Sequence, residues 1–153
     1  MTIYLVRHGK AGDRTRWDGP DDLRPLSKGG RKQAEAFVEQ LADAPVDRIV
    51  TSPSVRCRQS VEPLAEQRRL PVDLADELVE GAPLPDALRL LEKVAHEHAV
   101  LCTHGDVAGE VLSHLERRGV DLGDVVKLEK GSTWVLDVED GEVVAARYLP
   151  PPK

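Results

Sequence analysis

Short apolar runs alternate with longer amphipathic segments along this chain. Four runs have the length of a strand, and they cover residues 2–6, 46–51, 71–74 and 99–103. Continuous apolar runs of this length are typical of strands that are buried on both faces of a sheet. Farther along, residues 133–138 and 143–148 alternate around Asp140-Gly141, which predicts a β-hairpin.

Amphipathic segments between these runs predict helices. The apolar residues Ala34, Phe37, Val38 and Leu41 repeat with helical spacing after Ser27, which is a suitable N-cap. Further helices are expected to begin at Ser52-Pro53, at Pro85-Asp86 and directly after His104. We expect Pro63 to kink or end the second helix, because proline removes a backbone hydrogen bond.

Strands that alternate with helices predict parallel βαβ units in an α/β fold, with helices on both faces of the sheet. The 153 residues are expected to form one domain, residues 1–153. Residues 9–26 form a long polar loop, and loops of this length in small domains are usually functional or disordered. Ligands of such sheets bind outside the carboxyl ends of the strands.

Composition narrows the class of protein. Apolar residues make up 41% of the chain, and no apolar run approaches the length of a membrane span. Two cysteines without metal-type spacing, and an early Arg7 that argues against a signal peptide, lead us to expect a reducing, cytoplasmic location. The net charge of −6 argues against nucleic acid as a partner. Residues 1–59 are nevertheless basic, with 11 Lys and Arg against 8 Asp and Glu.

Three predicted strands are each followed by a cationic or ionisable side chain. The first leads to Arg7 and His8, the second to Arg56, and the third to His104. If the strands are parallel, all four side chains meet at one edge of the sheet. Arginine binds phosphate oxygens bidentately, and helix N-termini add N–H donors, so this edge is predicted to bind a tetrahedral dianion.

A neutral imidazole at such a site can act as a nucleophile toward phosphorus. It needs an acceptor on its other ring nitrogen, which fixes the tautomer. Surrounding cations would then spread the charge of the transferring phosphoryl group. This chemistry requires no metal and no other cofactor, and we expect none.

Three segments that carry these residues resemble the motifs of the histidine phosphatase (phosphoglycerate mutase-like) superfamily. They are Leu5-Val6-Arg7-His8-Gly9, residues 51–60 (TSPSVRCRQS) and Thr103-His104-Gly105. The resemblance implies that His8 is the nucleophile and that Arg7, Arg56 and His104 form the phosphate pocket. It also implies a three-layer α/β/α sandwich around a mainly parallel sheet.

Two subfamilies share further segments with this chain. Its short length and Arg24-Pro25-Leu26-Ser27 resemble SixA-type phosphohistidine phosphatases. Arg16-Trp17, Arg24-Pro25-Leu26 and residues 130–134 (KGSTW) resemble the phosphatase half of two-domain bacterial Nudix hydrolases, which handle nucleotides. These resemblances and the loop position of Lys10 lead us to expect substrate binding by seven residues: Arg7, Gly9, Lys10, Arg24, Arg56, His104 and Gly105.

A general acid for oxygen esters is less clearly marked. Superfamily members that cleave esters usually take it from a glutamate after the second helix, and Glu77 matches that position best. Glu80 is the second candidate and Asp106 the third, although Asp106 can equally cap the following helix. SixA-like proteins generally lack a dedicated acid, because a phosphoramidate leaving group is easier to expel.

The sequence therefore predicts a metal-independent phosphatase that forms a phosphohistidine intermediate on His8. The expected partners are a phosphorylated small molecule or a phosphohistidine protein, and neither nucleic acid nor a membrane. Three alternatives remain: a phosphoglycerate-type mutase, a nucleotide phosphatase, and a non-catalytic module that only binds phosphate. The short segments between predicted helices favour an open site and hydrolysis over the mutase.

Overall fold

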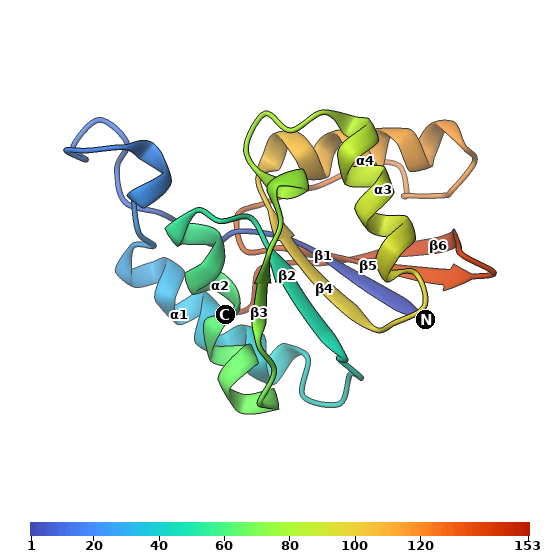
Figure 1. The fold of residues 1–153 in the computed structure, drawn as a ribbon, viewed down its shortest axis with the longest axis horizontal. Coiled ribbons are helices and arrows are strands. Elements are labelled where there is room, and N and C mark those ends of the chain that lie inside the picture. Colours follow the sequence, from blue (N-terminus) through green and yellow to red (C-terminus); the bar gives the residue numbers. More distant parts are fainter.

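A six-stranded sheet forms the centre of the molecule, which a computed structural model describes over residues 1–153 (Figure 1). The strand order is β3-β2-β4-β1-β5-β6. Strands β3, β2, β4 and β1 are parallel, and β5 and β6 are antiparallel to their neighbours. The strands are β1 (Thr2–Arg7), β2 (Arg48–Thr51), β3 (Val72–Leu74), β4 (Ala99–Thr103), β5 (Thr133–Glu139) and β6 (Glu142–Leu149).

Four helices cover the two faces of the sheet, as the sandwich prediction requires (Figure 1). They are α1 (Lys28–Gln40), α2 (Val55–Arg68), α3 (Leu84–Val94) and α4 (Gly105–Arg117). Helices α1 and α2 pack on one face and α3 and α4 on the other. None of the four is long and apolar enough to cross a membrane.

Strand β4 shows why both faces can be covered. Its five residues are all buried, and their side chains alternate between two hydrophobic cores. Val100 and Cys102 pack in the core under α1 and α2, whereas Ala99 and Leu101 pack in the core under α3 and α4. The continuous apolar run seen in the sequence is therefore a central strand with two buried faces.

One helix cap and one hairpin turn form as the sequence predicts. The Ser27 hydroxyl accepts a hydrogen bond from the Gly30 N–H at 3.1 Å and caps α1. Asp140 and Gly141 join β5 to β6 with φ angles of 51° and 79°. Positive φ at both positions gives the turn a twist that matches a hairpin, which confirms that prediction.

Helix α2 begins later than predicted and does not end at Pro63. It begins at Val55 rather than at Ser52-Pro53, because the Ser52 hydroxyl lies beside His104 instead of capping the helix. It also continues through Pro63 to Arg68. Val61 and Leu64 on either side of this proline are completely buried, and their packing outweighs the lost backbone hydrogen bond.

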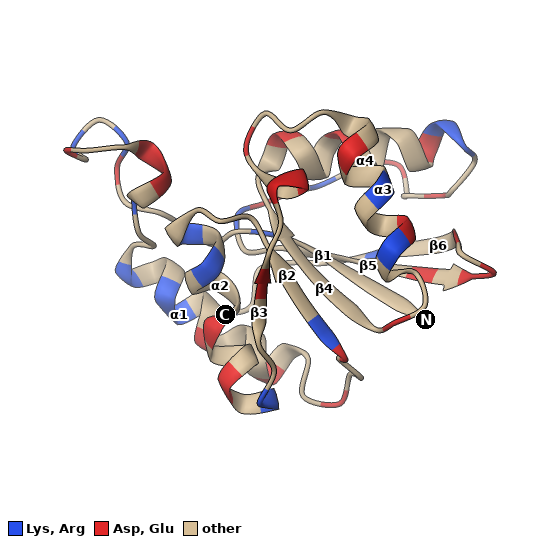
Figure 2. Ribbon diagram, viewed as in Figure 1, with Lys and Arg blue, Asp and Glu red and all other residues tan.

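Residues 9–26 form a loop whose two ends are tied together. Ala11 and Leu26 form an isolated antiparallel bridge, and the Ser27 N–H donates to the Lys10 carbonyl at 2.9 Å. A short 3₁₀ helix over Asp21–Leu23 lies near the far end of the loop. Lys and Arg gather on the nearby α1 and on the start of α2 (Figure 2), where much of the positive charge of the first 59 residues lies.

We expect Gly30 to be essential for the geometry of this loop. A Cβ at Gly30 would lie 1.9 Å from the Lys10 carbonyl oxygen, so Gly30→Ala must push the loop away from α1. Urea denaturation should show a free energy of unfolding lower by about 2 kcal/mol. Gly12→Ala is the control, because no atom lies within 4 Å of its Cβ position. Equal stability of the two variants would contradict this account.

Candidate active site

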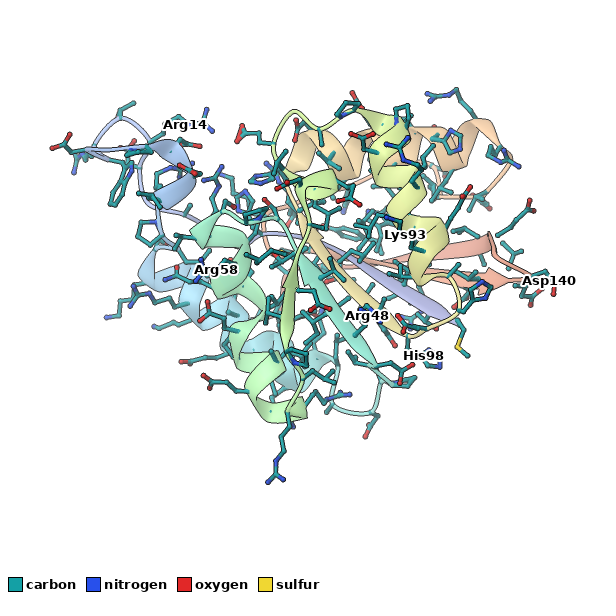
Figure 3. The ribbon with its side chains drawn as sticks, in the orientation of Figure 1. Arg14, Arg48, Arg58, Lys93, His98 and Asp140 are labelled. Atoms are coloured by element: carbon teal, nitrogen blue, oxygen red, sulfur yellow. The ribbon has the colours of Figure 1, made fainter.

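A polar pocket of about 770 Å³ lies where the parallel strands end. This end of the molecule carries Arg14, whereas Arg48 and His98 mark the amino ends of β2 and β4 (Figure 3). Arg7 pairs with Thr103 across β1 and β4, so His8 and His104 follow neighbouring strands at the same level. Thirteen residues line the pocket: Arg7, His8, Ala11, Gly12, Asp13, Arg14, Arg24, Arg56, Glu80, His104, Gly105, Asp106 and Lys130.

The His8 ring is held as a neutral imidazole. The side chain is only 7% exposed, and burial lowers its pKa from 6.5 to about 4. Its Nδ1 lies 2.8 Å from the Gly9 carbonyl oxygen, which can only accept a hydrogen bond. Nδ1 must therefore carry the proton, which leaves the lone pair on Nε2. This is the tautomer and protonation state that a nucleophilic histidine needs.

His104 lies edge-on to His8, with the ring centres 5.4 Å apart. Its Nε2 lies 2.9 Å from the Ser52 hydroxyl, and its Nδ1 lies 3.5 Å from an Arg56 guanidinium nitrogen. Because a guanidinium only donates, Nδ1 accepts from Arg56 and Nε2 is left to donate to Ser52. The loop after β2 thus sets the orientation of a histidine that follows β4.

Arg7 lies against the first turn of α4. One of its guanidinium nitrogens donates to the Leu128 carbonyl at 2.6 Å. A Cβ at Gly105 would lie 2.9 Å from the guanidinium carbon, so only glycine at this position lets the two groups approach so closely. The Arg7 and Arg56 Nε atoms are buried without a hydrogen-bond partner. Both arginines line the pocket, so their guanidinium groups lie beside any anion bound there.

Arg56 is the most buried charge of the site, with only 2% of its side chain exposed. One of its nitrogens lies 3.0 Å from the Asp21 carboxylate and 2.9 Å from the Glu80 carboxylate, and the other donates to the Asp21 carbonyl at 2.7 Å. Arg14 lies 3.5 Å from Asp21 and 3.7 Å from Glu80, which closes the network at the surface. Two exposed carboxylates therefore compensate the buried guanidinium.

The candidates for a general acid differ in position. Glu77, the first choice from the sequence, lies outside the pocket and pairs with Lys93 at 3.8 Å. Glu80 lines the pocket, and its carboxylate lies 3.9 Å from His104 Nδ1. The Asp106 carboxylate accepts a hydrogen bond from the Gly81 N–H at 2.7 Å and so holds the turn that carries Glu80. The structure thus favours Glu80 over Glu77.

Of the seven expected substrate-binding residues, two lie outside the pocket and a third has its guanidinium bound to the neighbouring loop. Gly9 and Lys10 do not line this pocket, although Arg7, Arg24, Arg56, His104 and Gly105 do. Arg24 is 6% exposed, and its guanidinium donates to the Gly12 carbonyl and the Asp21 carboxylate at 2.6 and 3.1 Å. Arg24 therefore shapes the loop at the pocket wall.

Three residues of the site are not marked as such by the sequence, and of these only Lys130 lines the pocket itself. The pattern around Ser52 predicts a helix cap, Asp21 carries no signal within the polar loop, and Lys130 belongs only to a subfamily motif. Their parts in the site depend on contacts with residues 35 or more positions away, such as Asp21 with Arg56. The Ser-Pro pair after a strand was a signal for the first, but it was equally consistent with a helix start.

Comparison with known proteins agrees with this geometry. The family model described as "Histidine phosphatase superfamily (branch 1)" matches residues 3–82. A protein of Mycolicibacterium smegmatis named 8-oxo-(d)GTP phosphatase is 40% identical over 99% of this chain and 48% of its own length. A Schizosaccharomyces pombe protein named as a probable phosphatase is 31% identical over 94% of this chain and 70% of its own. The chain thus spans about half the length of the mycobacterial relative.

Solved structures give the same fold. The protein histidine phosphatase SixA in complex with tungstate superposes with a TM-score of 0.78 and 17% identity, covering 97% of this chain and 94% of that one. The predicted resemblance to the superfamily and to SixA-type structures, and the predicted α/β sandwich, are confirmed.

We expect the buried His8 to make stability depend on pH. Its folded-state pKa of about 4 lies below the 6.5 of an unfolded chain, so the unfolded state binds the proton first as the pH falls. The free energy of unfolding should drop by about 3 kcal/mol between pH 6.5 and pH 4 through this group. The measurement is urea denaturation across that range, with His8→Asn lacking this part of the drop. An NMR titration midpoint of His8 near 6.5 would contradict the assignment.

Proposed function

The chain belongs to the histidine phosphatase superfamily, and from this premise we propose that it is a phosphatase that transfers a phosphoryl group first to His8 and then to water. The observation that carries the proposal is the state of His8. A buried imidazole with its lone pair on Nε2 faces a pocket lined by Arg7, Arg56 and His104. A module that only binds phosphate would gain nothing from this arrangement.

In the first step, the lone pair of His8 Nε2 forms a bond to phosphorus, and the bond from phosphorus to the leaving group breaks. The equatorial oxygens carry the charge of the transferring phosphoryl group and must be held in place. The attacking nitrogen, the phosphorus and the leaving group can then stay in line. The guanidinium groups of Arg7 and Arg56, which line the pocket, and the α4 N-terminus are suited to hold them. The pocket's cations supply the charge that this step needs, so we propose a metal-independent reaction.

In the second step, water attacks the phosphorus of the phosphohistidine. The P–N bond breaks, orthophosphate leaves, and Nε2 regains its lone pair. An alkoxide leaving group in the first step needs a proton, and Glu80 is the carboxyl group nearest to His104. The same group, as a carboxylate, would take a proton from the water in the second step. Glu80 is therefore proposed as the acid and base, held by Asp106 through the Gly81 turn.

The proposed substrates are phosphohistidine or small phosphomonoesters. The pocket is open and polar, with Ala11 as its only hydrophobic lining residue, so it recognises the phosphate more strongly than the group attached to it. A nucleotide phosphatase is the second candidate, because the mycobacterial relative is named for a nucleotide substrate.

Replacing His8 should abolish the covalent intermediate. His8→Ala is expected to lower kcat/KM for p-nitrophenyl phosphate at least about 1000-fold, because no other ring nitrogen lies at the attacking position. Intact mass spectrometry of enzyme quenched during turnover in EDTA should show a phosphorylated wild type and an unlabelled variant. His96→Ala, an exposed histidine on the surface, is the matched control. A labelled His8→Ala enzyme would refute the proposal.

A Glu80→Gln substitution should discriminate between leaving groups. Hydrolysis of glycerol 2-phosphate, whose alkoxide must be protonated, is expected to fall about 100-fold. Hydrolysis of p-nitrophenyl phosphate, whose phenolate leaves unprotonated, should fall only a few-fold. Glu77→Gln lies outside the pocket and should leave both rates near wild type. An equal loss on both esters would mean that Glu80 only positions Arg56 and is not the acid.

A further inference from the structure

A second groove of about 650 Å³ adjoins the proposed active site. We call it the lysine groove because four of its ten lining residues are lysines; three others are prolines of the C-terminal tail. It lies between the start of α1, the turn before β5 and the C-terminal tail. The ten residues are Lys10, Gly29, Lys32, Gln33, Glu129, Lys130, Pro150, Pro151, Pro152 and Lys153.

The two cavities share a wall. Lys130 lines both of them, and the N–H of the next residue, Gly131, lies 3.0 and 2.9 Å from the carbonyl oxygens of Arg7 and His8. Lys10, on the other side of the groove, is the second residue after His8. A substrate whose phosphoryl group reaches His8 can therefore extend over Lys130 into the lysine groove.

Gln33 holds the two sides of the groove together. Its side-chain oxygen accepts a hydrogen bond from the Lys10 N–H at 2.9 Å, and its nitrogen donates to the Lys130 carbonyl at 3.1 Å. Glycines at positions 9 and 131 let this side chain pass, since a Cβ at either would lie within 2.9 Å of it. The backbones that carry Lys10 and Lys130 are thus fixed relative to His8, and only the lysine side chains need to adapt.

The charge of the groove is unbalanced. None of its four lysines lies within 4 Å of a carboxylate, although ion pairs are common elsewhere in the molecule. Glu129 is its only acidic residue, and the first turn of α1 contains none. On a chain with a net charge of −6, this concentration of unpaired cations beside a helix N-terminus favours an anion.

We propose that the lysine groove is a subsite for the remote phosphates of a polyphosphorylated small molecule whose terminal phosphoryl group is transferred to His8. The inference rests on the proposed transfer to His8 and favours the second candidate, a nucleotide-type substrate, because consecutive phosphates are joined by anhydride bonds. No aromatic side chain lines the groove to stack on a base, and four lysines supply its charge, which suits phosphate groups. Lysines act as mobile point charges, which suits a flexible chain of phosphates rather than one rigid anion.

The test compares inorganic tripolyphosphate with orthophosphate as inhibitors of p-nitrophenyl phosphate hydrolysis. Wild type should bind tripolyphosphate at least about tenfold more tightly than orthophosphate. The double variant Lys32→Gln/Lys153→Gln, which alters lysines that line only the groove, should lose about fivefold in tripolyphosphate affinity. Its inhibition by orthophosphate and its kcat and KM for p-nitrophenyl phosphate should remain as in wild type.

Lys127→Gln is the matched control, since Lys127 is exposed and lines neither cavity. Equal binding of the two anions by wild type, an unchanged tripolyphosphate affinity in the double variant, or the same loss in Lys127→Gln would overturn the proposal. Tighter inhibition by a glutamate-rich peptide than by tripolyphosphate would also overturn it and assign the groove to an acidic protein segment. If p-nitrophenyl phosphate is not hydrolysed, calorimetric titration with tripolyphosphate still tests the groove independently of the proposed function.

Discussion

The burial of Arg56 is the constraint on which the architecture of the site depends. A guanidinium stays charged at every relevant pH, so a side chain with 2% exposure needs acceptors close by. These come from Asp21 in the loop after β1 and from Glu80 in the turn after β3. One charge on α2 thereby brings together two segments that share no strand pairing. The cationic pocket and the fold of its rim are consequences of the same interaction.

The same charges bear on the proposed use of the pocket. The two carboxylates around Arg56 are each more than 40% exposed, so water already weakens their hold. A phosphate dianion brings more charge to the guanidinium than either carboxylate alone and can also bind it bidentately. His8 lies beside this charge but stays neutral, because burial lowers its pKa to about 4. Cationic binding groups and a neutral nucleophile therefore coexist within one pocket.

The parallel sheet gives these groups their common location, and short polar contacts give them their orientation. Strands β1 and β4 end at paired residues, which brings His8 and His104 together with their ring centres 5.4 Å apart. Ser52 from the neighbouring strand end then holds His104, and the absence of a side chain at Gly105 admits Arg7. On the outer side of the site, the Gln33 side chain joins the loops of Lys10 and Lys130 by hydrogen bonds and so fixes the two sides of the lysine groove.

Local sequence patterns are enough to predict the strands, the helices and the edge of the sheet at which the chemistry occurs. Strand and helix periodicity depends on neighbours along the chain, and the carboxyl ends of parallel strands must share an edge, so Arg7, His8 and His104 were predictable as a group. Tertiary structure alone decided which residues complete the site. Glu77 and Glu80 lie three positions apart, and their local sequence does not distinguish them. The Gly81–Asp106 hydrogen bond and the charges of Arg56 and Arg14 hold Glu80 at the pocket. Such choices rest on distances between separate segments, which periodicity does not encode.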